Sequence, residues 1–400
     1  MRKAIRNIFA ALLLLFISGL SAVEVSLVAS NALNVSDMFS GLPAHRTPAI
    51  PELTAVRPGH KFNIYILLSK IQTQKGKAHV TGSMYLKSGE KKTELFKNQE
   101  LFYGECFAPT SINLSNLVAN WDFSSDDPEG KHTFVIEVKD MVNGFTKTAE
   151  LDIKLIHKPL TPLKINTNEI RGFISTFYKA PQPERLPELF NIFLSGDAAA
   201  RKNKNYSPLP LLYGMAKAIE QNPFVWKEFA ALSPELETDH KKYLALLFAA
   251  AGSDAMKFMI KNADRKTAGY LKQMQANNPW QFNEPYPEED INAFWMEFYF
   301  TGKPEPILKI ANQLRNRPTM TPEQAKKRKG ELSPAEKNRL RNYYSASSAA
   351  WSLNLNAARH NLVFFYLEGM LDKGDFADTT TAAKIQKILL RTAAEGSGSK

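Results

Sequence analysis

The hydrophobic rhythm of this 400-residue chain changes near residue 160. Before that point, apolar and polar side chains alternate through 131–140 and again through 149–155, on either side of Asn143-Gly144. Alternation around an Asn-Gly pair predicts a β-hairpin. Beyond it, apolar residues recur every three or four positions, which predicts helices. The chain is therefore predicted to be an α+β multidomain protein, with a β-domain followed by an all-α domain.

The β-domain is predicted to span 59–157 and to be an antiparallel sandwich of the immunoglobulin or fibronectin type III kind. Trp121 and Phe123 are expected to fill its core. Residues 23–58 contain four prolines and little periodicity, which predicts an extended lead-in. The further strands expected in the domain are 62–68, 79–87, 94–103 and a short piece at 117–123.

The helical domain is predicted to span 167–395, after a proline-stiffened linker at 158–166. Helix starts are expected at four Ser-Pro or Ser-Asp pairs, namely Ser207-Pro208, Ser233-Pro234, Ser253-Asp254 and Ser333-Pro334. Helix ends are expected at Gly196, Gly252, Gly302 and Gly374. The segment 248–258 parallels 299–309, with a fainter copy near Gly196, which indicates either a helical repeat or an irregular bundle. Residues 396–400 are expected to be a flexible tail.

The first 22 residues have the three parts of a signal peptide: a cationic start, an unbroken apolar run at 8–17, and small residues up to Ala22. The alternative is a retained membrane anchor, but spanning a bilayer takes about 20 apolar residues. Export to the periplasm is the prediction, with an extracellular location as the alternative. No transmembrane segment is expected in the mature chain.

Metal and cofactor motifs are missing from the sequence. Cys106 is the only cysteine, and none of the seven histidines pair at metal-binding spacing. Cys106 is expected to be a buried structural residue, and no cofactor is predicted. Four acids are weak candidates for calcium binding, and a polar turn between strands is the favoured interpretation: Asp122, Asp126, Asp127 and Glu129.

A second acidic group, Glu288, Glu289 and Asp290, directly precedes an apolar helical stripe. Acids are favoured in the first turn of a helix because they offset the positive end of its dipole. Paired carboxylates also serve as general acid and base in hydrolases. If the chain is an enzyme, these three residues and His360 are the catalytic candidates.

Positive charge is concentrated in one segment. The formal net charge is +11, and 315–341 holds nine Lys or Arg against three Glu, a net of +6. The segment could bind an anionic partner or be a solvated insertion. Nucleic acid is not predicted as the partner, because no aromatic residue lies between the charges. The candidate residues are Arg315, Arg317, Lys326, Lys327, Arg328, Lys329, Lys337, Arg339 and Arg341.

Three stretches resemble an uncharacterised group of exported bacterial proteins that combine a small β-sandwich with a helical C-terminal region. They are DDPEGKHTFVIEVKD at 126–140, FWMEFYFTG at 294–302 and AWSLNLNAARH at 350–360. The resemblance implies a location in the bacterial envelope and brings no catalytic residues. The basic stretch 318–334 is an insertion relative to this pattern.

These observations favour a non-enzymatic exported protein that binds a protein or polymer of the bacterial envelope. Two alternatives remain open. One is an envelope hydrolase that acts on a glycan or peptide polymer with a site in the helical domain. The other is an anionic-surface binder that uses 315–341.

Overall fold

The computed structural model describes residues 23–43, 46, 48–105, 112–165, 169–202, 206–316, 320–327 and 331–397. The chain forms two compact units. The first, here called the β unit, takes in the chain up to Asn31 and Glu52–Pro159; the second, the helical unit, comprises Ala32–Pro51 and Leu160–Lys400. The predicted signal peptide, Cys106 and the last three residues of the tail lie outside the described residues.

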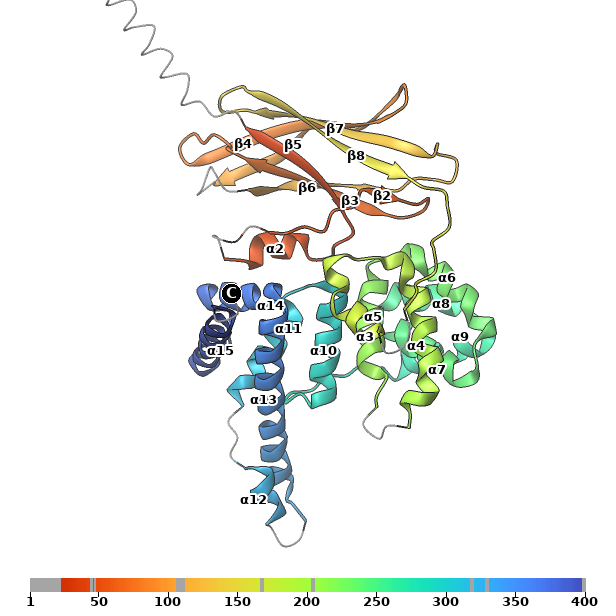
Figure 1. Cartoon of the computed structure of the whole chain (residues 1–400), viewed down its shortest axis with the longest axis vertical. Coiled ribbons are helices and arrows are strands. Elements are labelled where there is room, and N and C mark those ends of the chain that lie inside the picture. Colours follow the sequence, from red (N-terminus) through yellow and green to blue (C-terminus); the bar gives the residue numbers. More distant parts are fainter. Residues whose placement is uncertain are drawn as a thin grey trace, which may run out of the picture. The chain divides into compact units, whose positions relative to one another are not determined.

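The β unit contains two sheets that share one buried core (Figure 1). One sheet has the order β1-β3-β6 and the other the order β2-β8-β7-β4-β5. All strand pairs are antiparallel except the short pair β2–β8. The strands are β1 (Glu24–Ser30), β2 (Ala55–Val56), β3 (Phe62–Ser69), β4 (Lys77–Ser88), β5 (Lys91–Glu105), β6 (Asn113–Trp121), β7 (Gly130–Asp140) and β8 (Thr146–Leu155).

The alternating apolar side chains of the strands form this core, as expected. The rings of Phe62, Phe123 and Phe134 meet at centroid distances of 6.1 to 6.4 Å, and all three are buried. Trp121 is only partly buried and packs on the cluster from its edge. Gly144 has φ +77° in the turn between β7 and β8, the conformation for which glycine is suited.

The predicted lead-in, 23–58, is not one extended segment, because it contains a helix as well as strands. Its first part is β1, which pairs with β3 in register from Glu24↔Ser69 to Ser30↔Asn63. A later part is helix α2 (Val35–Gly41), which belongs to the helical unit and places Met38 in that unit's core. Helical structure therefore also occurs before residue 160.

The helical unit is formed by helices and short 3₁₀ turns. The α-helices after α2 are α3 (Ile170–Ser175), α4 (Leu186–Ala200), α5 (Leu209–Glu220), α6 (Trp226–Leu232), α7 (Thr238–Ala250), α8 (Ser253–Asn262), α9 (Arg265–Ala276), α10 (Glu288–Thr301), α11 (Glu305–Asn312), α12 (Pro322–Lys326), α13 (Pro334–Arg359), α14 (Asn361–Lys373) and α15 (Thr379–Ser397). The 3₁₀ turns are η1 (Phe177–Lys179), η2 (Pro183–Arg185), η3 (Pro223–Val225), η4 (Ser233–Glu235) and η5 (Gln313–Arg315).

Most of the residues that were predicted to begin or end helices do so. Ser333 caps α13 in a capping box with Glu336. Gly302 and Gly374 end α10 and α14 in the left-handed conformation. Gly196 does not end a helix, because α4 continues to Ala200. Ser233 begins the 3₁₀ turn η4 rather than an α-helix.

Helices α5 and α10 pack with their backbones in close contact. A Cβ atom on Gly214 of α5 would lie 2.4 Å from the carbonyl carbon of Met296 in α10. Only glycine permits this approach, so the residue at position 214 determines how closely α5 and α10 pack. None of the described helices is long and apolar enough to span a bilayer.

Candidate functional sites

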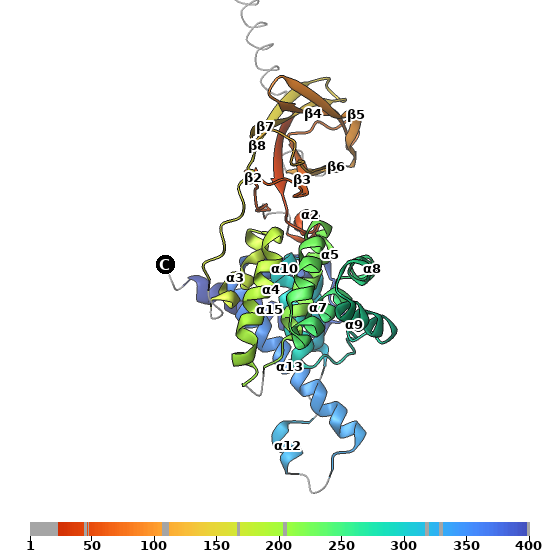
Figure 2. The ribbon, with the colours of Figure 1, turned by 90° about the vertical axis from the view of Figure 1, so that its right-hand side faces the viewer.

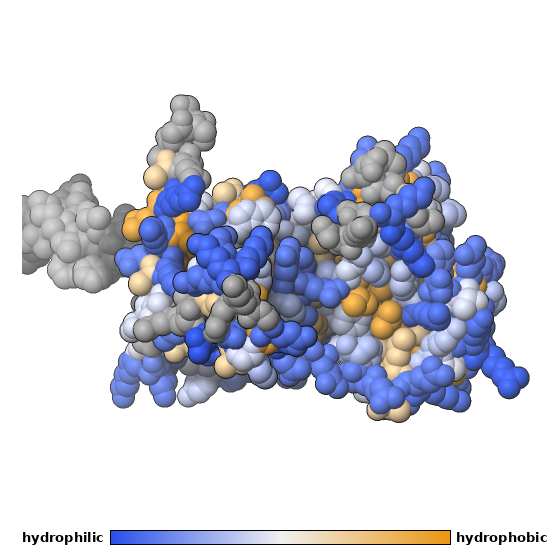
Figure 3. Space-filling view, turned by 90° about the horizontal axis from the view of Figure 1, so that it is seen from below, coloured by the Kyte–Doolittle hydropathy of each residue, from blue (hydrophilic) through white to orange (hydrophobic). Residues whose placement is uncertain are grey.

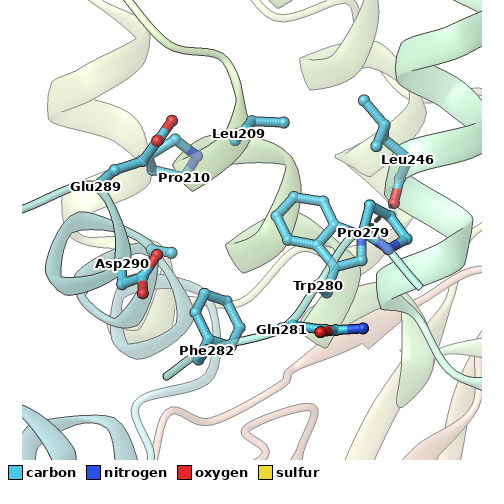
Figure 4. A pocket seen from close by; sticks show the side chains of 10 residues that line it. Leu209, Pro210, Leu246, Pro279, Trp280, Gln281, Phe282, Glu289 and Asp290 are labelled. Carbon is cyan, nitrogen blue, oxygen red and sulfur yellow. Dashed lines mark hydrogen bonds between the residues drawn. The ribbon is translucent and has the colours of Figure 1, made fainter. Parts of the chain in front are cut away.

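A hollow of about 260 Å³ opens between α5, α7, α10 and the loop before α10 (Figure 4). Most of its wall is apolar, and its polar groups are one amide and two carboxylates. The lining residues are Leu209, Pro210, Leu246, Pro279, Trp280, Gln281, Phe282, Glu289, Asp290 and Ala293.

The aromatic part of the hollow is held rigidly. The indole nitrogen of Trp280 donates to the carbonyl oxygen of Leu246 at 3.0 Å. The ring of Tyr213 lies 5.4 Å from the indole and 4.8 Å from the ring of Phe282. Phe282 in turn packs on Phe294, at 5.0 Å. The indole therefore presents a fixed surface to the hollow.

Two of the predicted acids line this hollow. Glu289 accepts a hydrogen bond from the hydroxyl of Ser207. Asp290 is half-buried, and burial together with the neighbouring charge of Glu289 raises its pKa to about 6, against the opposing charge of Arg341. Glu288 is exposed and does not line the hollow. All three acids lie in the first turn of α10, where they also offset the helix dipole.

His360 lies away from these acids. It follows α13 and is 5% exposed, with its Nδ1 atom 3.2 Å from the hydroxyl of Tyr178. Its ring packs 5.3 Å from that of Tyr299, in the last turns of α10. At 1.5 Å per residue, the nine-residue separation of Tyr299 from Asp290 is about 13 Å along the helix. The structure does not bring His360 to the carboxylates, so the four candidates do not form one catalytic group.

The basic segment projects from the rest of the helical unit. We call the described residues 321–327 and 331–344 the arm; it consists of α12 and the first turns of α13 (Figures 1 and 2). Helix α12 has no buried residue, and none of residues 331–344 is buried. The view from below shows a mainly hydrophilic face with scattered hydrophobic patches (Figure 3).

The predicted cations differ in their surroundings. Arg315 belongs to η5 rather than to the arm and forms an ion pair with Glu284. Arg341 reaches the carbonyl of Pro285 at 3.5 Å. Within the described chain, four exposed arm cations form no salt bridge: Lys326, Lys327, Lys337 and Arg339. Arg317, Arg328 and Lys329 lie outside the described residues.

Sequence reasoning missed two aromatic residues on α13. Tyr344 is 49% exposed and Trp351 is 69% exposed. They are seven residues apart, as are Lys337 and Tyr344, so all three share one face of the helix. The signal lay just beyond the basic segment, in two large aromatic residues spaced seven apart.

The calcium candidates lie in the turn between β6 and β7. Asp127 accepts hydrogen bonds from the backbone and hydroxyl of Ser124, at 2.7 and 3.1 Å, which closes the turn. Asp122, Asp126 and Glu129 are exposed. Within the part of the chain that the structure describes, no group of three potential metal ligands comes together.

Comparison with known proteins adds little. No protein-family model and no curated protein matches the chain. A family 123 glycoside hydrolase from Clostridium perfringens, studied for glycolipid glycan hydrolysis, aligns at 13% identity and a TM-score of 0.21, over 46% of this chain and 36% of the hydrolase. The sporulation control protein Spo0M from Bacillus subtilis aligns at 10% identity and a TM-score of 0.19, over 39% of this chain and 56% of Spo0M. Scores this low support no inference about fold or function.

Proposed function

We propose that this chain is an exported, non-enzymatic binding protein of the bacterial envelope that attaches to an anionic lipid surface through its arm. The observation that carries the proposal is the arm itself. The arm carries four exposed cations that form no salt bridge in the described chain, together with the exposed Tyr344, and Trp351 follows on the same face of α13. None of the described residues of the arm is buried.

The arm adds little to the stability of the fold, which favours a role in binding. Stability comes mainly from apolar burial, and α12 buries no side chain. A helix without buried residues gains little from packing. The capping boxes at Thr321 and Ser333 nevertheless give both arm helices a defined start. Both arm helices therefore have a defined start, although α12 adds nothing to the core.

The chemistry of the arm suits an anionic membrane. A Lys or Arg close to such a surface contributes about 1 kcal/mol. Tyr and Trp favour the zone of lipid headgroups, because their rings are apolar with a polar edge. Lys337, Tyr344 and Trp351 on one helix face would place both kinds of group on the same surface. Three glutamates of the segment, at 323, 331 and 336, reduce its net charge but leave it positive.

The remaining parts of the proposal concern location and architecture. Export rests on the signal-like first 22 residues, and the envelope location on the resemblance of 126–140, 294–302 and 350–360. We also propose that the β unit is a sandwich of the immunoglobulin or fibronectin type III kind. The turns at Gly252 and Gly302, each between two helices, support two copies of a helical repeat.

The proposal is tested by sedimenting the protein from residue 23 onward with lipid vesicles. Vesicles with phosphatidylglycerol should bind it more strongly than vesicles of phosphatidylcholine alone. Because exposed charges are screened by salt, binding should weaken strongly between low and physiological ionic strength. Equal binding to both vesicles, or no effect of salt, would contradict the proposal.

A parallel incubation with isolated envelope separates the alternatives. Capture of a protein or polymer instead of lipid would favour a scaffold role. Release of soluble glycan or peptide fragments would favour the hydrolase.

A further inference from the structure

The size of the hollow at Trp280 limits what can enter it. Pockets for drug-sized ligands measure about 300 to 1,000 Å³, and this one is smaller, at about 260 Å³. A water molecule accounts for about 30 Å³ of the liquid. The hollow therefore has room for a small organic molecule.

The walls divide into two chemically different sides. In Figure 4 the indole of Trp280 and the ring of Phe282 face the space, and Leu246 lies beyond the indole. Glu289 and Asp290 come from α10 on the other side. The described lining includes no Lys or Arg. An occupant would therefore meet aromatic faces on one side and negative charge on the other.

The carboxylates of Glu289 and Asp290 are compensated only in part, by the positive end of the α10 dipole and by neighbouring side chains. Glu289 receives the Ser207 hydroxyl, which is a neutral donor. Asp290 has the charge of Arg341 nearby, but these two residues form no salt bridge in the described chain. Two adjacent carboxylates repel each other, so a cation placed between them and the indole would be attracted by both. The electron-rich face of Trp attracts cations in the same way.

We propose that the hollow binds a small organic ammonium ion, with its charged nitrogen between Asp290 and the face of Trp280 and its apolar part against Phe282 and Leu246. The fixed indole makes the site preorganised, so little ordering opposes binding. This site is separate from the arm, and its test is independent of vesicle binding.

The experiment uses choline as the cationic probe and 3,3-dimethylbutan-1-ol as its neutral isostere, with N-acetylglucosamine as a sugar probe. Each is titrated into the intact protein and followed by ligand-observed NMR. Choline should bind, and the isostere should bind about tenfold more weakly or worse, which corresponds to about 1.4 kcal/mol. The sugar should not bind.

Two matched variants locate the site. Asp290→Asn removes a charge that lines the hollow, and Glu288→Gln removes one from the same helical turn outside it. Asp290→Asn should weaken choline binding about tenfold, while Glu288→Gln should change it less than about twofold. Melting curves of both variants establish that each is folded.

Four results would overturn the inference. The isostere could bind as well as choline, or the two variants could weaken binding equally. The sugar could bind in place of choline, which would identify a glycan site. Finally, choline could fail to bind the folded wild-type protein.

Discussion

The side-chain amide of Asn34 donates a hydrogen bond to the carbonyl oxygen of Gly302, 2.9 Å away and 268 positions later in the sequence. The same amide lies 3.3 Å from the hydroxyl of Tyr366, in α14. Asn34 is 1% exposed, so both contacts are made without water. Asn34, which precedes α2, thus contacts the C-terminal end of α10 and the middle of α14, and so ties the segment 32–51 to the rest of the helical unit.

Replacing Asn34 with Ala should lower the free energy of unfolding by about 1 to 3 kcal/mol, because the buried carbonyl of Gly302 loses its partner. Chemical denaturation measures this change. Ser36→Ala, on the exposed side of the same short helix, is the control and should have little effect. A loss no larger than that of the control would show that the tether does not stabilise the unit.

Gly214→Ala should destabilise the helical unit by about 1 to 3 kcal/mol, because the new methyl group would overlap the backbone of α10. The matched control is Gly269→Ala in α9, where a Cβ atom would meet nothing within 4 Å. Alanine should stabilise that helix by up to about 1 kcal/mol. Opposite signs in thermal unfolding are expected, and two changes of the same sign would refute the close contact.

Stability should depend on pH through His360. Burial, with the charges of Lys179 and Arg359, lowers its pKa to about 4 from an ordinary 6.5. Between pH 6.5 and 4 the unfolded chain binds a proton that the folded chain does not, so the contribution of His360 to stability is lost as pH falls.

The variant His360→Gln isolates this effect. It should be less stable than wild type at pH 7.5, and the difference should shrink as the pH approaches 5. Two other groups have shifted pKa values: that of Asp290 is raised, which acts in the opposite direction, and that of His60 is lowered. Both groups are present in the two proteins, so their effects on the difference in stability cancel. Denaturation curves at both pH values provide the comparison, and a constant difference would exclude titration of His360.

The aromatic face of α13 should contribute to surface binding. Tyr344→Ser combined with Trp351→Ser should weaken binding to phosphatidylglycerol vesicles without lowering the melting temperature, since both side chains are exposed. Exposed Tyr103 of the β unit offers a control substitution to Ser. If the double variant and the control bind alike, the aromatic residues have no part in attachment.

Much of the β unit could be predicted because alternation and the Asn143-Gly144 turn act locally. The strand β1 also has an alternating pattern, in Val23, Val25 and Leu27, but it directly follows the signal-like segment and was not recognised. Helix α2 has too few residues for a periodic signal, and tertiary contacts such as that of Asn34 hold it in place. Its assignment to the helical unit could not be read from neighbouring residues.

The helix ends show where local rules fail. Gly302 ends α10 with φ +66° and is pressed against Asn34 and Tyr178, so two constraints agree. Gly196 has only the intrinsic cost of glycine within a helix, about 1 kcal/mol. The buried side chains of Phe193, Leu194 and Asp197 around it favour continuation of α4.

The candidate sites were predicted in part. The concentration of Lys and Arg in 315–341 could be read directly from the sequence. The grouping of Glu289 and Asp290 with Trp280 could not be predicted, because it depends on how α5, α7 and α10 pack. The separation of His360 from these acids has the same cause.

The most direct test of attachment through the arm compares two variants that lose the same charge. One replaces all four residues of 326–329 with Gln; the other replaces Lys257, Lys261, Arg265 and Lys272 with Gln, on the exposed sides of α8 and α9. Co-sedimentation with phosphatidylglycerol vesicles at physiological salt should be lost for the first variant and retained by the second, with both melting like wild type. Equal binding by the two variants would contradict the account.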